Sequence, residues 1–224
     1  MDGDVDIAPV AALLGDPARA AIVGALHEGR ALPAGELARR AGVSPSTASE
    51  HLTKLVNGGL LLSESIGRHR YFRLAGPEVA HLFEALSVLA PRKAVHSLRG
   101  RNIGDALVGA RTCYDHLAGR LGVAIADALL DRRAVVERDG SYELGARADR
   151  VLAELGLSVA ELPPRRPSVL PCLDWSERRP HLAGALGAAI CIRSLEAGWI
   201  ERLPGSRAVR LTKAGSRTFA SLSL

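Results

Sequence analysis

The feature that most constrains the fold of this chain is the stretch from residue 36 to residue 55, where a glycine turn separates two helical patterns. The first helix is expected over residues 34–41, ending at Gly42. Ser44 and Pro45 then supply an N-cap and a proline at the first helical position, which opens a second helix. One face of the second helix is apolar and the other is polar, through Ser46, Thr47, Glu50, Thr53 and Lys54. This arrangement predicts a helix-turn-helix.

The flanking segments extend this motif to a winged helix-turn-helix. Asp16 and Pro17 repeat the cap-and-proline signal and predict a helix that ends near His27. Two strand-like runs, residues 60–63 and 71–74, predict a hairpin whose tip carries Arg68, His69 and Arg70. A further helix after Gly76 has an apolar stripe wider than a small domain needs, which predicts a dimer surface: Val79, Leu82, Phe83, Leu86 and Leu89.

The charge of the chain suits a nucleic-acid binder. There are 29 basic and 24 acidic residues, for a formal net charge of +5. Basic residues also predominate around the predicted hairpin, where Glu64 is the only acid between Lys54 and Arg73. We expect the DNA contacts to come from the polar side chains of the second helix and the hairpin: Ser44, Ser46, Thr47, Ser49, Glu50, Thr53, Lys54, Arg68, His69 and Arg70.

Residues 5–90 resemble the ArsR/SmtB family of winged-helix repressors. The resemblance rests on Asp16-Pro-Ala-Arg, on Glu36-Leu-Ala, and on the run from Val43 to Leu52 that continues to Gly59-Leu60. It implies a homodimer formed through the first and last helices of the domain. It also implies binding to an imperfect inverted repeat in double-stranded DNA, and release from that operator when an effector binds.

The resemblance does not identify the effector. The family's common thiolate site places cysteines at the positions that are here Ala38, Arg39 and Arg40, so this chain lacks that site. At the family's other metal site, on the last helix, this chain matches only weakly, with Glu78, His81 and Glu84 at helical spacing.

The second half of the chain repeats a pattern. Residues 116–125 match residues 181–190 at a constant offset of 65, and both begin His-Leu-Ala-Gly. We expect each copy to lie in a helix, followed by a hairpin (residues 134–144 or 199–211) and a further helix. The predicted fold class is therefore mostly α with short β-hairpins. Its parts are a DNA-binding and dimerisation domain (residues 1–92), a linker (93–104) and a duplicated, winged-helix-like effector or interaction block (105–224).

A soft or transition metal ion is the first candidate effector. Cys113 and His116 are expected at positions i and i+3 of one helical face, with His181 at the repeat-equivalent position. Cys172 or Cys191 could complete such a site. The alternative is that both histidines pack at helix starts and the cysteines are small core residues, which the repetition of His without Cys favours.

Two other sensors remain open. An organic effector could bind near Tyr114, Trp175, Arg178 and Arg179, where the arginines would hold an anionic group. A cysteine could also act as a thiol redox sensor.

Other functional classes fit poorly. No apolar run reaches the ~18–20 residues that span a bilayer, and the N-terminus is acidic, so we expect a cytoplasmic protein with reduced thiols. An enzyme fused to a DNA-binding domain is disfavoured because the sequence contains no GxGxxG, Walker, GxSxG or HExxH motif. We therefore predict a transcriptional repressor.

Overall fold

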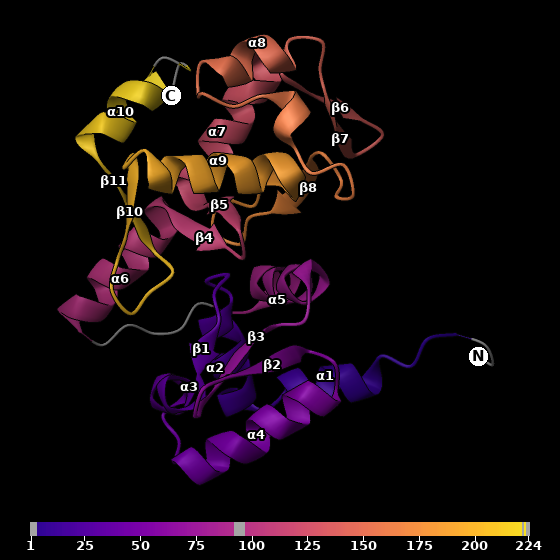
Figure 1. Ribbon diagram of the computed structural model, residues 1–224, viewed down its shortest axis with the longest axis vertical. Coiled ribbons are helices and arrows are strands. Elements are labelled where there is room, and N and C mark those ends of the chain that lie inside the picture. The colour runs from indigo at the N-terminus through magenta and orange to yellow at the C-terminus, as the bar shows by residue number, and fades with distance from the viewer. Residues whose placement is uncertain (1–3, 92–96, 221, 223–224) are drawn as a thin grey trace. The chain divides into compact units, whose positions relative to one another are not determined.

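The computed structural model describes residues 4–91, 97–220 and 222, and the chain divides into two compact units, Met1–Phe83 and Glu84–Leu224 (Figure 1). The division falls inside helix α5 (Pro77–Leu89) and not at the predicted boundary near residue 92. The predicted linker is also partly helical, because α6 (Leu98–Gly109) begins within it; residues 93–96 lie outside the described residues. Within the described ranges no single helix is long and apolar enough to cross a membrane, although α1 (Ala8–Leu14) and α2 (Pro17–Leu26) together meet that criterion across an 85° bend.

Unit 1 is a winged helix-turn-helix. Its elements are α1 (Ala8–Leu14), α2 (Pro17–Leu26), β1 (Leu32–Pro33), α3 (Ala34–Ala41), α4 (Pro45–Asn57), β2 (Leu61–Ile66), β3 (His69–Leu74) and the start of α5. The strands form an antiparallel sheet in the order β1–β3–β2. The predicted helix-turn-helix is confirmed, with α3 and α4 at the predicted bounds.

Local signals explain where these helices begin and end. The N–H of Arg19 donates to Asp16 Oδ1 at 2.9 Å, and the N–H of Thr47 donates to Ser44 Oγ at 3.2 Å, so both predicted caps are made. Gly42 has φ 68°, a left-handed conformation that ends α3 and turns the chain toward α4. The apolar faces then meet in a core of side chains that are almost wholly buried: Ile22, Val23, Leu26, Leu37, Leu52, Leu55, Leu61 and Leu74.

Unit 2 contains the same succession of elements twice. After α6 come β4 (Arg111–Cys113), β5 (His116–Ala118), α7 (Gly119–Asp131), β6 (Val135–Arg138), β7 (Ser141–Leu144) and α8 (Ala148–Ala153). After a short 3₁₀ turn (Val159–Glu161) come β8 (Leu170–Leu173), β9 (Pro180–Ala183), α9 (Gly184–Glu196), β10 (Ile200–Arg202), β11 (Val209–Leu211) and α10 (Lys213–Ala220). That this block is a winged-helix-like duplication stays a prediction.

Two hairpins of unit 2 were not predicted, and they correct the placement of the repeated histidines. His116 lies on β5 and His181 on β9, and the helices begin only at Gly119 and Gly184. Both glycines have a left-handed backbone, with φ 75° and 81°, which a right-handed helix cannot continue through. The His-Leu-Ala segments are therefore extended, although their apolar composition also suits a helix.

The two halves of unit 2 pack reciprocally. β5 lies against α9, as Figure 1 shows, and β9 lies against α7. A Cβ on Gly187 of α9 would sit 2.2 Å from the carbonyl oxygen of Leu182 and 3.1 Å from His116 Cβ. A Cβ on Gly122 of α7 would sit 2.4 Å from the carbonyl oxygen of Leu117. These glycines permit the close approach that brings β5 and β9 together.

Candidate functional site

Helix α4 presents a polar face that can enter a DNA groove. Ser44, Ser46, Ser49 and Glu50 are exposed, as are Thr53 and Lys54 farther along the helix. Thr47 is half-buried, and its hydroxyl lies 2.8 Å from Ser44 Oγ. The opposite face of α4 is held in the core by Ala48, Leu52 and Leu55, so the polar face is fixed in orientation.

The hydroxyls of this face are partly engaged within the helix. Ser44 Oγ lies 2.9 Å from Ser46 Oγ, and Thr53 Oγ1 donates to the carbonyl oxygen of Ser49 at 2.9 Å. Ser44 therefore has a structural role as the N-cap, whereas Glu50 and Lys54 are exposed charged groups. The α4 N-terminus itself carries the positive end of the helix dipole, which favours a nearby phosphate.

The wing is longer than predicted. Its strands pair as far as Ile66 with His69, so only Gly67 and Arg68 form the turn. His69 and Arg70 lie on β3 and not at the tip, which corrects their predicted position. Arg68, His69 and Arg70 are nonetheless all exposed.

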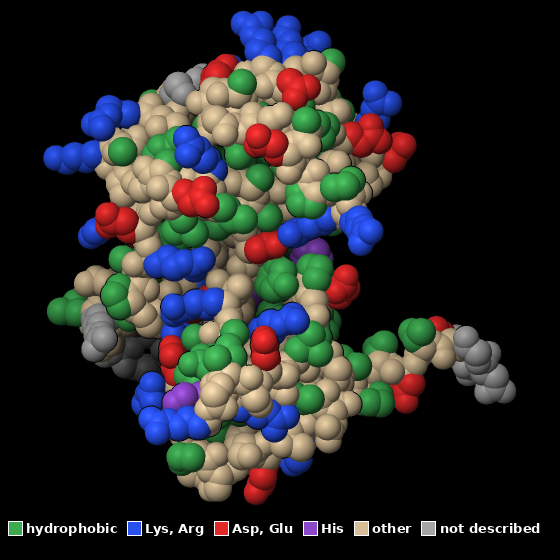
Figure 2. All heavy atoms as spheres, viewed as in Figure 1, with side chains coloured by type: hydrophobic (Ala, Val, Ile, Leu, Met, Phe, Trp, Pro, Cys, Tyr) green, Lys and Arg blue, Asp and Glu red, His purple; other side chains and the backbone are tan. Residues whose placement is uncertain are grey.

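Arg70 is held in place by its neighbours on the sheet. Its Nη2 donates to Ser63 Oγ at 2.8 Å, and its guanidinium lies 5.3 Å from the centre of the Phe72 ring. Overall charge does not mark a DNA-binding face, because basic side chains lie on the visible surface of both units (Figure 2). The DNA assignment therefore depends on the helix and wing geometry.

At the positions of the two metal sites of the resembled family, charged side chains of this chain make ion pairs. Ala38 is buried, and Arg40 pairs with Glu28 and with Glu36, the latter at 2.6 Å. On α5 the carboxylate of Glu84 is 1% exposed and pairs with Arg111 at 2.9 Å. Arg40 and Glu84 are therefore each held in an ion pair.

Unit 2 brings together four side chains that can bind a metal. One potential ligand atom from each of Cys113, His116, Cys172 and His181 lies within 4.8 Å of the others, and all four residues are buried. Each hairpin contributes a cross-strand pair: Cys113 lies opposite His116, and Cys172 lies opposite His181. The sequence placed Cys113 and His116 on one helical face, which is wrong, but it did name both of them and His181.

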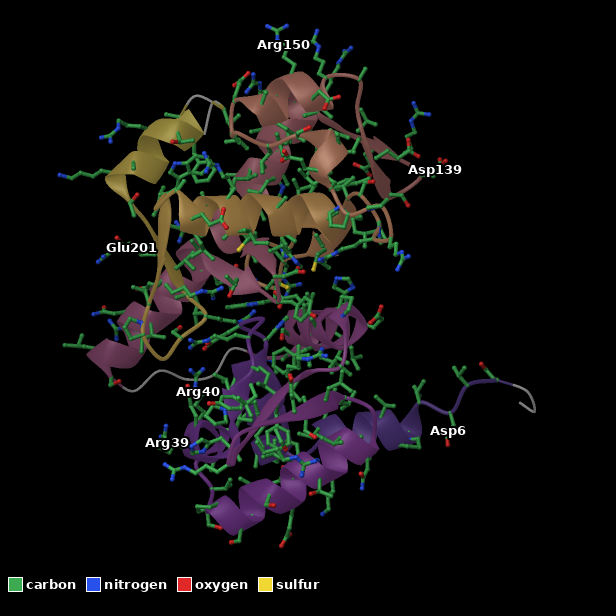
Figure 3. The ribbon with its side chains drawn as sticks, in the orientation of Figure 1. Asp6, Arg39, Arg40, Asp139, Arg150 and Glu201 are labelled. Atoms are coloured by element: carbon green, nitrogen blue, oxygen red, sulfur yellow. The ribbon has the colours of Figure 1, made fainter. Side chains whose placement is uncertain are left out.

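The sequence did not predict that Cys113 and Cys172 hold equivalent positions in their hairpins. Cys113 and His116 are joined by a tight turn, whereas the loop between Cys172 and His181 is six residues longer. The cysteines therefore do not share the constant offset of the histidines. Cys191, the other candidate to complete the site, is buried separately in the large core of α7 and α9. All the sulfur atoms drawn in Figure 3 lie in unit 2.

The histidine rings face each other. His116 Nε2 lies 3.2 Å from His181 Nε2, while each Nδ1 is next to a carboxylate: His116 Nδ1 lies 3.2 Å from Asp115 Oδ1, and His181 Nδ1 lies 3.2 Å from Asp174 Oδ2. The second contact is at ion-pair distance but is poorly aligned for a hydrogen bond. Burial alone lowers the pKa of both histidines, but their interactions with Cys113 and with these carboxylates leave both pKa values above the ordinary value.

Both carboxylates are fixed by further donors. Arg166 donates to Asp115 through two nitrogens, at 2.6 and 3.2 Å. Asp174 accepts from Arg111 at 2.9 Å and from the Gly119 N–H at 2.7 Å. Burial raises the pKa of Asp174, but the His181 contact and the Arg111 charge hold that pKa well below its usual range.

The thiols of Cys113 and Cys191 are poor nucleophiles in this environment. A hydrogen bond with Cys172, together with burial, raises the pKa of Cys113 to about 12, and burial raises the pKa of Cys191 to about 12. Since the thiolate is the reactive form, these two cysteines are unsuited to fast redox sensing.

The residues expected around an organic effector lie in hairpin loops. Tyr114 is in the turn between β4 and β5, and Trp175, Arg178 and Arg179 are in the longer loop between β8 and β9. Arg111 lies over the Trp175 ring at 4.6 Å, and Arg179 pairs with Asp127 at 2.6 Å. A small apolar cavity lies elsewhere, lined by Leu117, Gly122, Ile125, Leu182, Gly187 and Ile190.

Known proteins similar to this chain include HTH-type transcriptional regulators. A family described as a helix-turn-helix domain matches residues 14–64. The chain is 43% identical over 215 residues to YdfF, an uncharacterized HTH-type transcriptional regulator of Bacillus subtilis (strain 168), covering 96% of this chain and 95% of that protein. It is 31% identical over 159 residues to the HTH-type transcriptional regulator Rv0324 of Mycobacterium tuberculosis, covering 59% of this chain and 69% of that protein.

Among solved structures, the chain is similar to the homodimeric winged helix-turn-helix DNA-binding domain of Mb0332 from Mycobacterium bovis, a possible ArsR-family regulator. The identity is 28%, the TM-score is 0.36, and the match covers 43% of this chain and 100% of that domain.

Proposed function

This chain belongs to the HTH-type transcriptional regulators, and on that premise we propose that it is a homodimeric repressor of the ArsR/SmtB type that binds an inverted-repeat operator. The observation that carries the proposal is α4, whose apolar face is fixed in the core while its polar face is exposed next to a basic wing. Two such helices related by two-fold symmetry would enter successive major grooves about 34 Å apart. Because its target is duplex DNA and its relatives are bacterial, we place its action in the cytoplasm.

The dimer is proposed to form through α1 and α5. Helix α1 contains no buried residue, and Ile7 just before it is 72% exposed. On α5, Leu86 and Leu89 are 43% and 82% exposed. Apolar surface of this kind is stabilised by a partner, and an inverted-repeat operator requires two copies of the DNA-binding helix.

Unit 2 is the proposed sensing part. A DNA-binding module needs no second unit of this size, and unit 1 lacks the thiolate site of the resembled family. An effector bound in unit 2 would change DNA affinity only through its different affinity for the DNA-bound and released states, typically about 1–3 kcal/mol.

The test is a footprint of the full chain on the DNA upstream of its own gene, with and without zinc, cadmium, copper(I) and arsenite. We expect two protected half-sites one helical turn apart, and loss of protection with at least one of these ions. Protection of a single half-site would contradict the dimer. An unchanged footprint with all four ions would contradict release by a soft metal, and an organic ligand of the Tyr114 and Trp175 loops would then be screened.

A further inference from the structure

We propose that Cys113, His116, Cys172 and His181 form a closed tetrahedral site for Zn²⁺ that joins the two hairpins of unit 2. The inference goes beyond the proposed function, because the site would hold zinc whether or not zinc is the effector. It also differs in position from both metal sites of the resembled family, which lie in the winged helix-turn-helix domain.

The first argument is the number and arrangement of the donors. Two sulfurs and two imidazoles converge within 4.8 Å from two separate hairpins, and all four side chains are buried. A tetrahedral set of two sulfurs and two nitrogens is a preferred environment for zinc. Since four protein ligands leave no open position, the site is of the structural kind and not a catalytic one.

The second argument is the orientation of the imidazoles. The Nδ1 atoms of His116 and His181 each lie 3.2 Å from a carboxylate oxygen, of Asp115 and Asp174 respectively. The Nε2 atoms of the two rings face each other at 3.2 Å. An ion between the rings would therefore take Nε2 of each ring as its ligand.

The third argument is the distance. With Zn–N bonds of about 2.0–2.1 Å, two nitrogen ligands of a tetrahedral ion lie about 3.3 Å apart, close to the 3.2 Å between His116 Nε2 and His181 Nε2. A carboxylate behind the ring is also the usual hydrogen-bond partner of a zinc-bound histidine. The buried thiols also fit, because a metal ion would replace the proton on each sulfur.

The glycine contacts explain how the ligands are held. Gly187 of α9 lies against His116, and Gly122 of α7 lies against His181. Each half of unit 2 therefore positions the histidine of the other half. An ion bound between β5 and β9 would fasten these two halves together.

The experiment measures metal binding by the full chain, without DNA. The protein is purified under reducing conditions from zinc-supplemented cells, and its metal content is measured by mass spectrometry. We expect one zinc per chain. Replacement by Co²⁺ should give a thiolate-to-cobalt charge-transfer band and the intense visible bands of tetrahedral cobalt.

Matched variants locate the site. Cys113→Ser and Cys172→Ser should lose the charge-transfer intensity, whereas Cys191→Ser should keep it, because Cys191 is buried outside the cluster. Asp115→Asn keeps all four ligands and should weaken zinc binding about 10–100-fold by removing the carboxylate behind His116.

Three outcomes would overturn the proposal. The first is a wild-type chain that binds neither zinc nor cobalt under reducing conditions. The second is a Cys191→Ser variant that loses the cobalt spectrum as fully as Cys113→Ser does. The third is a disulfide between Cys113 and Cys172 that persists in the reduced cell extract. None of these outcomes tests operator binding. Evidence against this zinc site would therefore not contradict the proposed repressor function.

Discussion

At the scale of single residues, the structure separates side chains that stabilise unit 1 from those that can contact DNA. Ser44 was expected to do both, but its hydroxyl already accepts the N–H of Thr47 and lies close to the hydroxyls of Ser46 and Thr47. Its main contribution is therefore to the start of α4.

Substitution of Ser44 should weaken α4. Removing an N-cap hydroxyl costs about 1 kcal/mol, so Ser44→Ala should lower the free energy of opening of α4 by roughly this amount. Amide hydrogen exchange of α4 in the full chain measures this value. Ser44→Asp keeps a cap acceptor and should retain protection; equal loss in both variants would show that the hydroxyl does not act as a cap.

Arg111 is the residue whose loss should most destabilise unit 2. It is fully buried and pairs with Glu84 and Asp174 at 2.9 Å each. Arg111→Met leaves two buried carboxylates without this partner, which typically costs about 3–5 kcal/mol. Urea denaturation followed by tryptophan fluorescence would report this loss, because both tryptophans, Trp175 and Trp199, lie in unit 2.

The control is an exposed ion pair. Arg210 pairs with Glu201 at 2.5 Å, and both side chains are more than half exposed. Arg210→Met should change the free energy of unfolding by only about 0–1 kcal/mol. A similar cost in both variants would mean that the buried pair is not better stabilised than a surface pair.

At the scale of elements, the wing and α4 should serve different purposes on DNA. Arg68 and Arg70 are exposed on the wing, and we expect them to contact DNA phosphates. The polar face of α4 is expected to contact base edges instead. The two classes of interaction differ in their dependence on salt.

The Arg68→Ala, Arg70→Ala double variant should bind all duplexes more weakly. The slope of log affinity against log salt should fall by about 0.9 for each phosphate that is no longer neutralised. Titrations at several salt concentrations measure this slope. Ser46→Ala is the contrasting variant, since it should keep the slope and change the discrimination between operator variants by about 1–3 kcal/mol. An unchanged slope in the double variant would show that these two wing arginines do not neutralise DNA phosphates.

The packing of α9 on β9 and β5 should tolerate no side chain at Gly187. The added Cβ of Gly187→Ala would meet backbone at 2.2 Å, so the helix must move, at a cost of typically 1–3 kcal/mol. Gly104→Ala is the matched control, because that glycine lies in α6 with no atom within 4 Å of an added Cβ. The free energy of unfolding of this control variant should rise by about 0.4–1 kcal/mol. Thermal denaturation of both variants compares them, and equal melting temperatures would contradict the close approach.

At the scale of the whole molecule, oligomeric state is the property that operator binding depends on. The predicted dimer stripe is only partly free in the structure. Val79 is buried, and the Phe83 ring lies 5.3 Å from the His27 ring within unit 1, so Phe83 is a poor probe of a dimer surface.

Leu86 is the better probe. Leu86→Glu should give a folded monomer that no longer binds the full operator, because a charge replaces an exposed apolar side chain of the proposed interface. Sedimentation velocity gives the mass, and far-ultraviolet circular dichroism confirms folding. Ile192→Glu is the control, since Ile192 is similarly exposed on α9 of unit 2 and should leave the dimer intact. A Leu86→Glu dimer would refute this surface.

The sequence by itself determined unit 1, because its signals are local. Each helix of the helix-turn-helix has its cap, proline or glycine within a few residues of its end, and the apolar periodicity of α4 selects the buried face. The strands of the wing are nonetheless longer than the sequence predicts, because strand length depends on pairing. β3 begins at His69, where it pairs with Ile66 of β2.

Only the tertiary structure decided the metal-ligand cluster. Cys113 and Cys172 become equivalent through the register of two hairpins, and the different loop lengths hide this in the sequence. His116 and His181 meet because β5 packs on α9 and β9 on α7, a reciprocal arrangement of segments far apart in the chain. Periodicity reports which face of an element is buried but not what it is buried against, so a site built from opposing faces requires the fold.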